Sequence, residues 1–174
     1  MVKKNIRIGF DLDGVIIGKP PFIPNYIMEK LVRNPTGKKL GYRYPKYSIE
    51  RKIRILSHYP LFRPPIRNNI NLIKELYKSN AYTLYVVSSR YSFLKSRTRQ
   101  WFGYYKLRRF FKEIYINDFD EQPHLFKERM IKRLGLHVFI DDDLLLLKYL
   151  RTRSKDIDLI YVKDHEKYVR GILK

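Results

Sequence analysis

Short apolar runs alternate with stretches of helical periodicity along most of the chain. The apolar runs have the length and β-branched character of buried strands, and they span residues 6–10, 82–87, 113–116, 137–140 and 159–162. Between them, apolar residues repeat with helical spacing at 69–79, 92–102, 123–134 and 144–150. Strands that alternate with helices predict a parallel sheet with helices on both faces.

The segment 18–65 interrupts this alternation. It is rich in proline and contains two helical patterns, one beginning at Asn25 and one at Ser48. We therefore expect an α/β protein of 174 residues, in which residues 1–17 and 66–174 form a Rossmann-like three-layer sandwich around a central parallel sheet. Residues 18–65 are expected to form a small, mostly helical cap inserted into this core domain.

Polar residues gather where three of the predicted strands end. They are Asp11 and Asp13 after the first strand, Ser88 and Ser89 after the second, and the aspartates 141–143 after the fourth. Parallel strands place their carboxyl ends at one edge of the sheet, where the reactive groups of such folds gather. We therefore expect these side chains to form one site.

Asp11 and Asp13 leave the first strand two residues apart and lead into Gly14. This spacing offers one carboxylate that can attack and a second that can exchange protons, while glycine allows a sharp turn. A calcium-binding loop is excluded, because the next three residues are apolar where oxygen ligands would be needed. For this motif alone, an ordinary turn remains the alternative.

The neighbouring aspartates at 141–143 are costly unless a cation or donor groups offset their charge. They predict a hard divalent ion, Mg²⁺, shared with Asp11. Ser88 is placed to donate a hydrogen bond to a phosphoryl oxygen, and Lys127, on the helix before the aspartates, could neutralise phosphoryl charge. Taken singly, Ser88 could equally cap a turn, and Lys127 could equally be a solvated lysine.

The order of these features resembles the haloacid dehalogenase-like superfamily of hydrolases. Its four motifs match Asp11-Leu12-Asp13-Gly14, Ser88 within Val86-Val87-Ser88-Ser89-Arg90, Lys127, and Asp141-Asp142 after Val138-Phe139-Ile140. The match spans nearly the whole chain, and the predicted cap follows the first motif, as in small nucleotidase-like members. Ser88 stands where threonine is frequent in the family, and it keeps the hydroxyl group.

The resemblance implies a phosphatase mechanism. By it, Asp11 is the nucleophile that forms an aspartyl-phosphate, and Asp13 is the acid that protonates the leaving oxygen and the base that then activates water. Ser88, with Ser89 beside it, and Lys127 would hold phosphoryl oxygens. The implied activity is that of a phosphomonoesterase, with nucleotides as the first substrate class to test.

The resemblance also implies a set of magnesium ligands. The Asp11 side chain, the Asp13 backbone carbonyl and the Asp142 side chain would bind Mg²⁺. Asp141 and Asp143 are further candidates that would contact the ion through water.

The chain carries a net charge of +20, and most of this charge is regional. Segments 19–67 and 90–112 hold 18 of the 20 excess positive charges. Regional positive charge favours a polyanionic partner such as nucleic acid, or an acidic substrate. Compositional bias is an equal alternative, because the chain has one alanine, Ala81, and is rich in Lys, Ile, Tyr and Asn.

Basic and aromatic residues are interleaved in residues 42–47 and 101–112, as in proteins that bind single-stranded nucleic acid. Large aromatic side chains are usually buried, so the core is the favoured place for four of these rings. They are Trp101, Phe102, Phe110 and Phe111. The sequence leaves open the places of three others, Tyr42, Tyr44 and Tyr47.

Several classes of site are excluded or disfavoured. Cysteine is absent, which excludes disulfides, thiolate zinc sites and a cysteine nucleophile. The histidines show no ligand spacing and are expected in turns or at the surface; they are His58, His124, His137 and His165. No run of about 18 apolar residues occurs, so we expect a cytoplasmic protein that does not contact a membrane.

Three functions remain open. The first is a phosphomonoesterase that acts on a phosphorylated metabolite, and the second is an enzyme that removes terminal phosphates from DNA or RNA. The third is a nucleic-acid-binding protein with an idle hydrolase site. The intact acid pair, Asp11 and Asp13, argues against the third.

Overall fold

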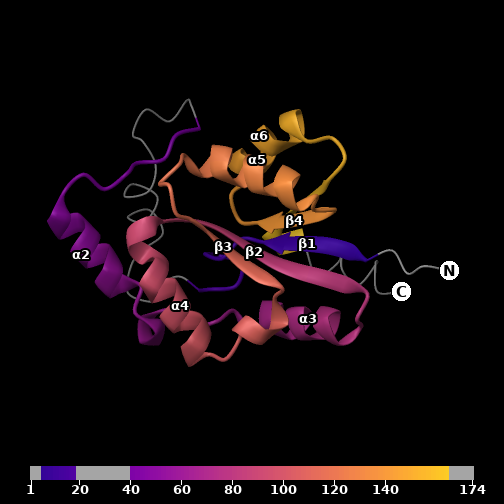
Figure 1. The fold of residues 1–174 in the computed structure, drawn as a ribbon, viewed down its shortest axis with the longest axis horizontal. Coiled ribbons are helices and arrows are strands. Elements are labelled where there is room, and N and C mark those ends of the chain that lie inside the picture. Colours follow the sequence, from indigo (N-terminus) through magenta and orange to yellow (C-terminus); the bar gives the residue numbers. More distant parts are fainter. Residues whose placement is uncertain (1–4, 19–39, 165–174) are drawn as a thin grey trace.

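The computed structural model describes residues 5–18 and 40–164. In these residues, five parallel strands form one sheet in the order β3-β2-β1-β4-β5 (Figure 1). The strands are β1 (Ile6–Phe10), β2 (Tyr82–Tyr91), β3 (Glu113–Asn117), β4 (Val138–Asp141) and β5 (Asp158–Tyr161). The predicted α/β fold with a central parallel sheet is confirmed.

Helices cover both faces of this sheet (Figure 1). One face carries α3 (Arg67–Lys78) and α4 (Lys95–Tyr104), and the other carries α5 (Pro123–Leu134) and α6 (Leu144–Arg153). Side chains alternate along a strand, so Leu84 and Val86 of β2 pack in the hydrophobic cluster with α3 and α4. Tyr85 and Val87 pack in the second cluster, with α5 and α6. Among the described helices, none is long and apolar enough to cross a membrane.

The carboxyl ends of β2, β1 and β4 lie side by side. Phe10 of β1 aligns with Val86 of β2 on one side of the strand and with Ile140 of β4 on the other side. All three strands run in the same direction, so the segments that follow them meet at one edge of the sheet. This is the edge at which the sequence predicts the site.

The main difference from the predicted elements concerns β2. The sequence predicted a strand over residues 82–87, whereas β2 continues to Tyr91. Ser88, Ser89 and Arg90 are typical of a turn, but here they continue the strand through pairing with β3, across a shift of register between Ser88 and Tyr91. The extension carries Arg90 past the last residue of β1 that pairs with β2.

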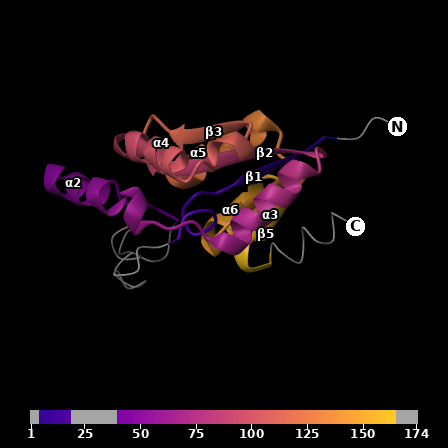
Figure 2. The same cartoon turned by 90° about the horizontal axis from the view of Figure 1, so that it is seen from below.

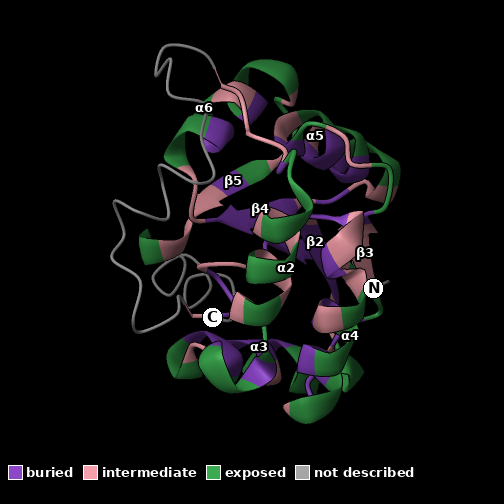
Figure 3. Cartoon of the chain, turned by 90° about the vertical axis from the view of Figure 1, so that its left-hand side faces the viewer, coloured by how far each residue is buried: buried purple, intermediate pink, exposed green. Residues whose placement is uncertain are grey.

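The second helix predicted in the segment 18–65 is confirmed as α2 (Ser48–Ser57), which lies to the side of the sheet (Figure 2). The helix is exposed or half-buried along its length (Figure 3), and three of its four apolar residues are between 61 and 64% exposed: Ile49, Ile53 and Leu56. The half-buried positions of the helix include Ile55 and also Glu50, which pairs with Arg43 and Arg54. The helix predicted from Asn25 lies outside the described residues.

Two aromatic side chains of α4 and the turn after it attach the end of this segment to the core. The Trp101 indole donates a hydrogen bond to the Arg63 carbonyl at 2.6 Å. The Tyr105 hydroxyl donates to the Pro60 carbonyl at 3.0 Å. These bonds fix the backbone around Arg63 relative to the sheet.

The aromatic residues predicted to belong to the core do so. Trp101, Phe102 and Phe111 are buried in the cluster that also holds α3, and Phe110 packs half-buried against it. The rings of Trp101, Phe102 and Phe111 are therefore not available to stack on nucleic acid bases.

The three tyrosines that the sequence left open divide into two kinds. The Tyr42 hydroxyl donates to Asp143 at 2.6 Å, and the Tyr44 hydroxyl donates to Asp120 at 3.0 Å, so both link the segment 40–47 to the core. Tyr47 is exposed. Tyr42 and Tyr44 are half-buried, so Tyr47 is the most exposed of the three.

The substitution Trp101→Phe tests how much the attachment to Arg63 stabilises the fold. Phenylalanine keeps an aromatic ring but removes the N–H, which leaves the buried Arg63 carbonyl without this donor. We expect the free energy of unfolding, measured by urea titration, to fall by about 1–3 kcal/mol. Tyr104→Phe, on the same helix and 62% exposed, is the control and should change it by less than about 0.5 kcal/mol. Equal losses in the two variants would contradict the assignment.

Candidate active site

Asp11 and Asp141 meet at the edge where β1 and β4 end. The Asp11 amide donates to the Ile140 carbonyl at 2.9 Å, and both aspartates are buried. Lys127 reaches them from α5: its Nζ lies 2.8 Å from Asp11 Oδ1 and 2.6 Å from Asp141 Oδ2. Three of the residues predicted for the site thus form one buried cluster.

The charges in this cluster do not balance, because two buried carboxylates share one ammonium group. Burial raises the pKa of Asp11 to about 7, and Asp141 adds to the rise, against the opposing effect of Lys127. Burial raises the pKa of Asp141 as well. Burial alone would lower the pKa of Lys127, but the two carboxylates outweigh it and raise that pKa, so the lysine stays charged.

Asp142 adds a third carboxylate to the cluster. One carboxylate oxygen from each of Asp11, Asp141 and Asp142 lies within 4.8 Å of the others. Magnesium prefers oxygen ligands, and a divalent cation here would supply the positive charge that the three carboxylates lack beside Lys127. The donor set therefore fits the ion that the sequence predicted, with Asp141 in the same group as Asp142.

The residues beside Asp142 shape this arrangement. Gly14 has a φ of +80°, in the left-handed region, and a β-carbon at this position would overlap the Asp142 carboxylate. Asp143 makes a different contact: its carboxylate caps α6 by accepting from the amides of Leu145 and Leu146. Gly14 thus leaves space for the Asp142 carboxylate, while Asp143 fixes the start of α6.

Asp13 is held by two arginines. Arg90 donates to both carboxylate oxygens at 2.7 Å, from Nε and from Nη2. Arg63 Nη2 also donates to Oδ1. Burial alone would raise the pKa of Asp13, but Arg90 and then Arg63 outweigh it and hold that pKa well below its usual range. Asp13 is therefore a carboxylate in this arrangement, and 37% of its side chain is exposed.

The sequence did not reveal that Arg63 contacts Asp13 or that His58 lies near this pair. Arg63 is one of many basic residues in its segment, and its neighbours in the chain do not distinguish it. His58 was expected in a turn or at the surface; it follows α2, half-buried and within electrostatic reach of Asp13. Burial, and after it Arg90, lowers the pKa of His58 to about 3, so its ring is neutral. Arg90 stood in the second motif, but its contact with Asp13 was not predicted.

Ser88 lies on β2 two residues beyond Val86, which pairs with the last residue of β1. It is buried, and its hydroxyl oxygen accepts a hydrogen bond from the Arg90 amide at 3.3 Å. Ser89 is half-buried next to it. Phosphate binding by these two serines stays a prediction.

No family model matches the sequence, and no curated protein matches it significantly. Solved structures do match. A haloacid dehalogenase-like family hydrolase from Streptococcus pneumoniae aligns with a TM-score of 0.57 at 19% identity, over 97% of this chain and 99% of that chain. A haloacid dehalogenase superfamily hydrolase from Ehrlichia chaffeensis aligns with a TM-score of 0.57 at 13% identity, over 100% of both chains. The chain has the haloacid dehalogenase-like fold.

A chain of the Pnkp1/Rnl/Hen1 RNA repair complex is also similar in structure. It aligns with a TM-score of 0.57 at 11% identity, over 92% of this chain and 43% of that chain. The present chain therefore matches less than half of that longer protein.

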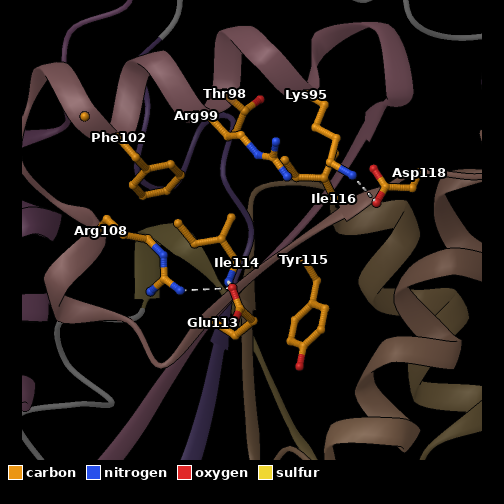
Figure 4. Close-up of a pocket in the computed structure, with 11 residues that line it drawn as sticks. Lys95, Thr98, Arg99, Phe102, Arg108, Glu113, Ile114, Tyr115, Ile116 and Asp118 are labelled. Carbon is orange, nitrogen blue, oxygen red and sulfur yellow. Dashed lines mark hydrogen bonds and ion pairs between the residues drawn. The ribbon is translucent and has the colours of Figure 1, made fainter.

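A hollow of about 470 Å³ lies between α4 and β3 of this haloacid dehalogenase-like fold (Figure 4). Most of its charged lining is paired: Lys95 Nζ lies 2.6 Å from Asp118, and Arg108 Nη2 lies 3.0 Å from Glu113. Two of the basic residues in segment 90–112 are therefore compensated by acids that follow the segment. The regional charge is weaker at the surface here than the sequence indicates.

The raised pKa of Asp11 makes magnesium binding dependent on pH. Mg²⁺ binds the carboxylate and not the acid, and Asp11 has a pKa of about 7 before the ion binds. A proton therefore competes below pH 7, and we expect the dissociation constant for Mg²⁺ to fall roughly tenfold between pH 6 and pH 8 in calorimetric titrations. The raised pKa of Asp141 acts in the same direction. Equal affinity at the two pH values would contradict the assignment of Asp11 as a ligand.

The substitution Gly14→Ala tests the space beside Asp142. The added β-carbon would displace the Asp142 carboxylate, and alanine is strained at a φ of +80°. We expect at least a tenfold loss of Mg²⁺ affinity and about 1–3 kcal/mol of lost stability. Gly103→Ala is the matched control, because a β-carbon there meets nothing within 4 Å and lies in a helix. It should leave Mg²⁺ affinity unchanged; a loss in both variants would show that the effect is not local.

Proposed function

We propose that this chain is a magnesium-dependent phosphomonoesterase that works through an aspartyl-phosphate intermediate. The observation that carries this proposal is the contact of Lys127 with both Asp11 and Asp141, beside the carboxylate of Asp142. The ammonium group would neutralise a transferring phosphoryl group, and the carboxylates would hold Mg²⁺. The haloacid dehalogenase-like fold supports the same conclusion.

The reaction has two displacements at phosphorus. First, an Asp11 carboxylate oxygen forms a bond to phosphorus while the bond to the leaving oxygen breaks, and Asp13 in its acid form gives its proton to that oxygen. Second, a water oxygen forms a bond to the same phosphorus while the bond to Asp11 breaks, and Asp13 takes a proton from the water. The products are an alcohol and inorganic phosphate, and both aspartates return to their starting forms.

The other residues of the site hold charge during these displacements. Lys127 and the Ser88 hydroxyl would hold phosphoryl oxygens, since both lie at the sheet edge beside Asp11. Bound Mg²⁺ would offset the negative charge of the phosphoryl group and the carboxylates. The Asp13 backbone carbonyl is the further ligand that the family resemblance implies.

Asp13 must gain a proton before the first displacement, and Arg63 and Arg90 oppose this. A phosphomonoester brings negative charge that competes with Asp13 for the guanidinium groups. When an arginine turns to the substrate, the pKa of Asp13 rises. Substrate binding would thereby prepare Asp13 to act as the acid.

A polynucleotide end phosphatase is the second candidate. It is favoured by the positive charge of segments 19–67 and 90–112, and the likeness of the fold to a chain of an RNA repair complex adds to it. This candidate predicts that hydrolysis of 3′-phosphorylated oligonucleotides improves with strand length and that the gain falls steeply as the salt concentration rises. A phosphatase of small metabolites would show no dependence on strand length.

The substitution Asp11→Asn tests the reaction itself. Asparagine keeps the shape of the side chain but is not a nucleophilic carboxylate. We expect magnesium-dependent release of phosphate from p-nitrophenyl phosphate to fall at least about 1,000-fold. Asp156→Asn is the control, because this exposed aspartate precedes β5 and so lies near the amino ends of the strands, whereas Asp11 follows a carboxyl end. This variant should keep full activity. Phosphate release by the native protein that persists in EDTA would contradict the metal requirement.

A further inference from the structure

The positive charge around Asp13 exceeds what this carboxylate neutralises. Arg90 and Arg63 both donate to it, which leaves one positive charge in excess. Arg63 is 2% exposed, and within residues 5–18 and 40–164 its Nε and Nη1 have no hydrogen-bond partner. Unpaired donors on a buried charged group are costly. Arg63 is therefore short of an acceptor.

Among residues 5–18 and 40–164, Asp13 is the acid with which Arg63 forms an ion pair. Asp11 and Asp141 are engaged by Lys127. Glu50 pairs with two other arginines. His58, the further titratable group near the arginines, is neutral because burial and Arg90 lower its pKa to about 3. An anion that enters from outside would complete the charge balance.

The excess charge lies on the side of the leaving group. In the proposed reaction Asp13 protonates the leaving oxygen, so the rest of the leaving group lies beside the Asp13 side chain. Arg90 comes to this place from β2, and Arg63 comes from the segment predicted as the cap. Neither arginine contacts Asp11, whose charge is met by Lys127.

We propose that Arg63, beside Arg90, forms a subsite for a second anionic group, carried by the leaving group of the substrate. This rests on the proposed phosphomonoesterase function and narrows its substrate class to phosphomonoesters with a further phosphate a short distance from the one removed. A nucleoside 3′,5′-bisphosphate and the phosphorylated end of a nucleic acid strand share this chemistry. Guanidinium groups suit it, because their planar array of N–H donors matches phosphate oxygens.

Arg63 is the residue that changes partner on binding. Its Nε and Nη1 are enclosed, so its side chain must shift to reach the second anion. Asp13 tolerates the loss of Arg63, because Arg90 alone donates to both carboxylate oxygens. The subsite thus couples recognition of the leaving group to the release of Asp13 from one of its two cations.

The preference for a substrate with a second phosphate over one without it tests whether this subsite binds an anion. The experiment compares kcat/KM for removal of the 3′-phosphate from thymidine 3′-monophosphate and thymidine 3′,5′-bisphosphate, with the products separated by chromatography. We expect the native protein to favour the bisphosphate by roughly tenfold or more. In Arg63→Gln this ratio should fall to near one, whatever the absolute rates are. Arg63→Lys keeps the charge and should retain part of the preference.

Arg133→Gln is the matched control. It removes the same charge from an exposed residue in the last turn of α5, near the amino ends of the strands and so away from Asp13. Its selectivity should equal that of the native protein. The inference is overturned if the native protein shows no preference, if the preference survives Arg63→Gln, or if Arg133→Gln abolishes it as well.

Binding measurements separate a failure of this inference from a failure of the proposed function. If neither p-nitrophenyl phosphate nor the two nucleotides are hydrolysed, the proposed function is wrong. Calorimetry on the Asp11→Asn protein then decides the subsite on its own. Tighter binding of the bisphosphate than of the monophosphate, lost on adding Arg63→Gln, supports it, and equal binding overturns it.

A third substrate distinguishes the two sources of the second anion. A 3′-phosphorylated thymidine dinucleotide carries an internal phosphodiester where the bisphosphate carries a monoester. Each substrate is compared with thymidine 3′-monophosphate, in the native protein and in Arg63→Gln. If the Arg63-dependent preference is larger for the dinucleotide, the subsite binds strand ends, and if it is larger for the bisphosphate, the subsite binds small substrates. Absence of an Arg63-dependent preference for both overturns the subsite.

Discussion

The contact of Lys127 with two buried carboxylates is the interaction on which this site depends. Charged side chains are tolerated in a protein interior only when they pair with opposite charges in good geometry. Parallel pairing of β1 with β4 brings Asp11 and Asp141 to one edge of the sheet, and α5 carries Lys127 to the same point. The ammonium group compensates only part of the negative charge, so the same arrangement that stabilises the cluster also favours a divalent cation beside it.

Two aspartates only two residues apart have opposite electrostatic environments. Burial raises the pKa of Asp11, whereas Arg90 and Arg63 lower that of Asp13. The proposed reaction needs the reverse order, with Asp11 ionised and Asp13 protonated. A cation beside Asp11 and an anion at the arginines would each shift its aspartate in the required direction. In the proposed mechanism, the metal and the substrate complete the site together.

The segment that supplies Arg63 links stability to this electrostatic arrangement. The Arg63 carbonyl accepts from the buried Trp101 indole, while its guanidinium contacts Asp13. The aromatic cluster of α4 therefore positions a charged group of the site. Trp101 belongs to the basic and aromatic segment 101–112, which suggested nucleic acid binding in the sequence, and in the fold it supports the backbone of Arg63 beside the candidate site.

The sequence by itself determined the elements and the residues at their ends, because those signals are local. The helical spacing of apolar residues, with Pro123 at the start and Gly135 after the end, predicted α5, and Gly135 has the left-handed conformation. The ends of the predicted strands marked Asp11 and Asp141. Tertiary structure alone decided the extension of β2, which needs pairing with β3, and the role of Arg63. One arginine among many basic residues carries no local signal, since its partner is a carboxylate 50 residues away that only the folded chain brings near.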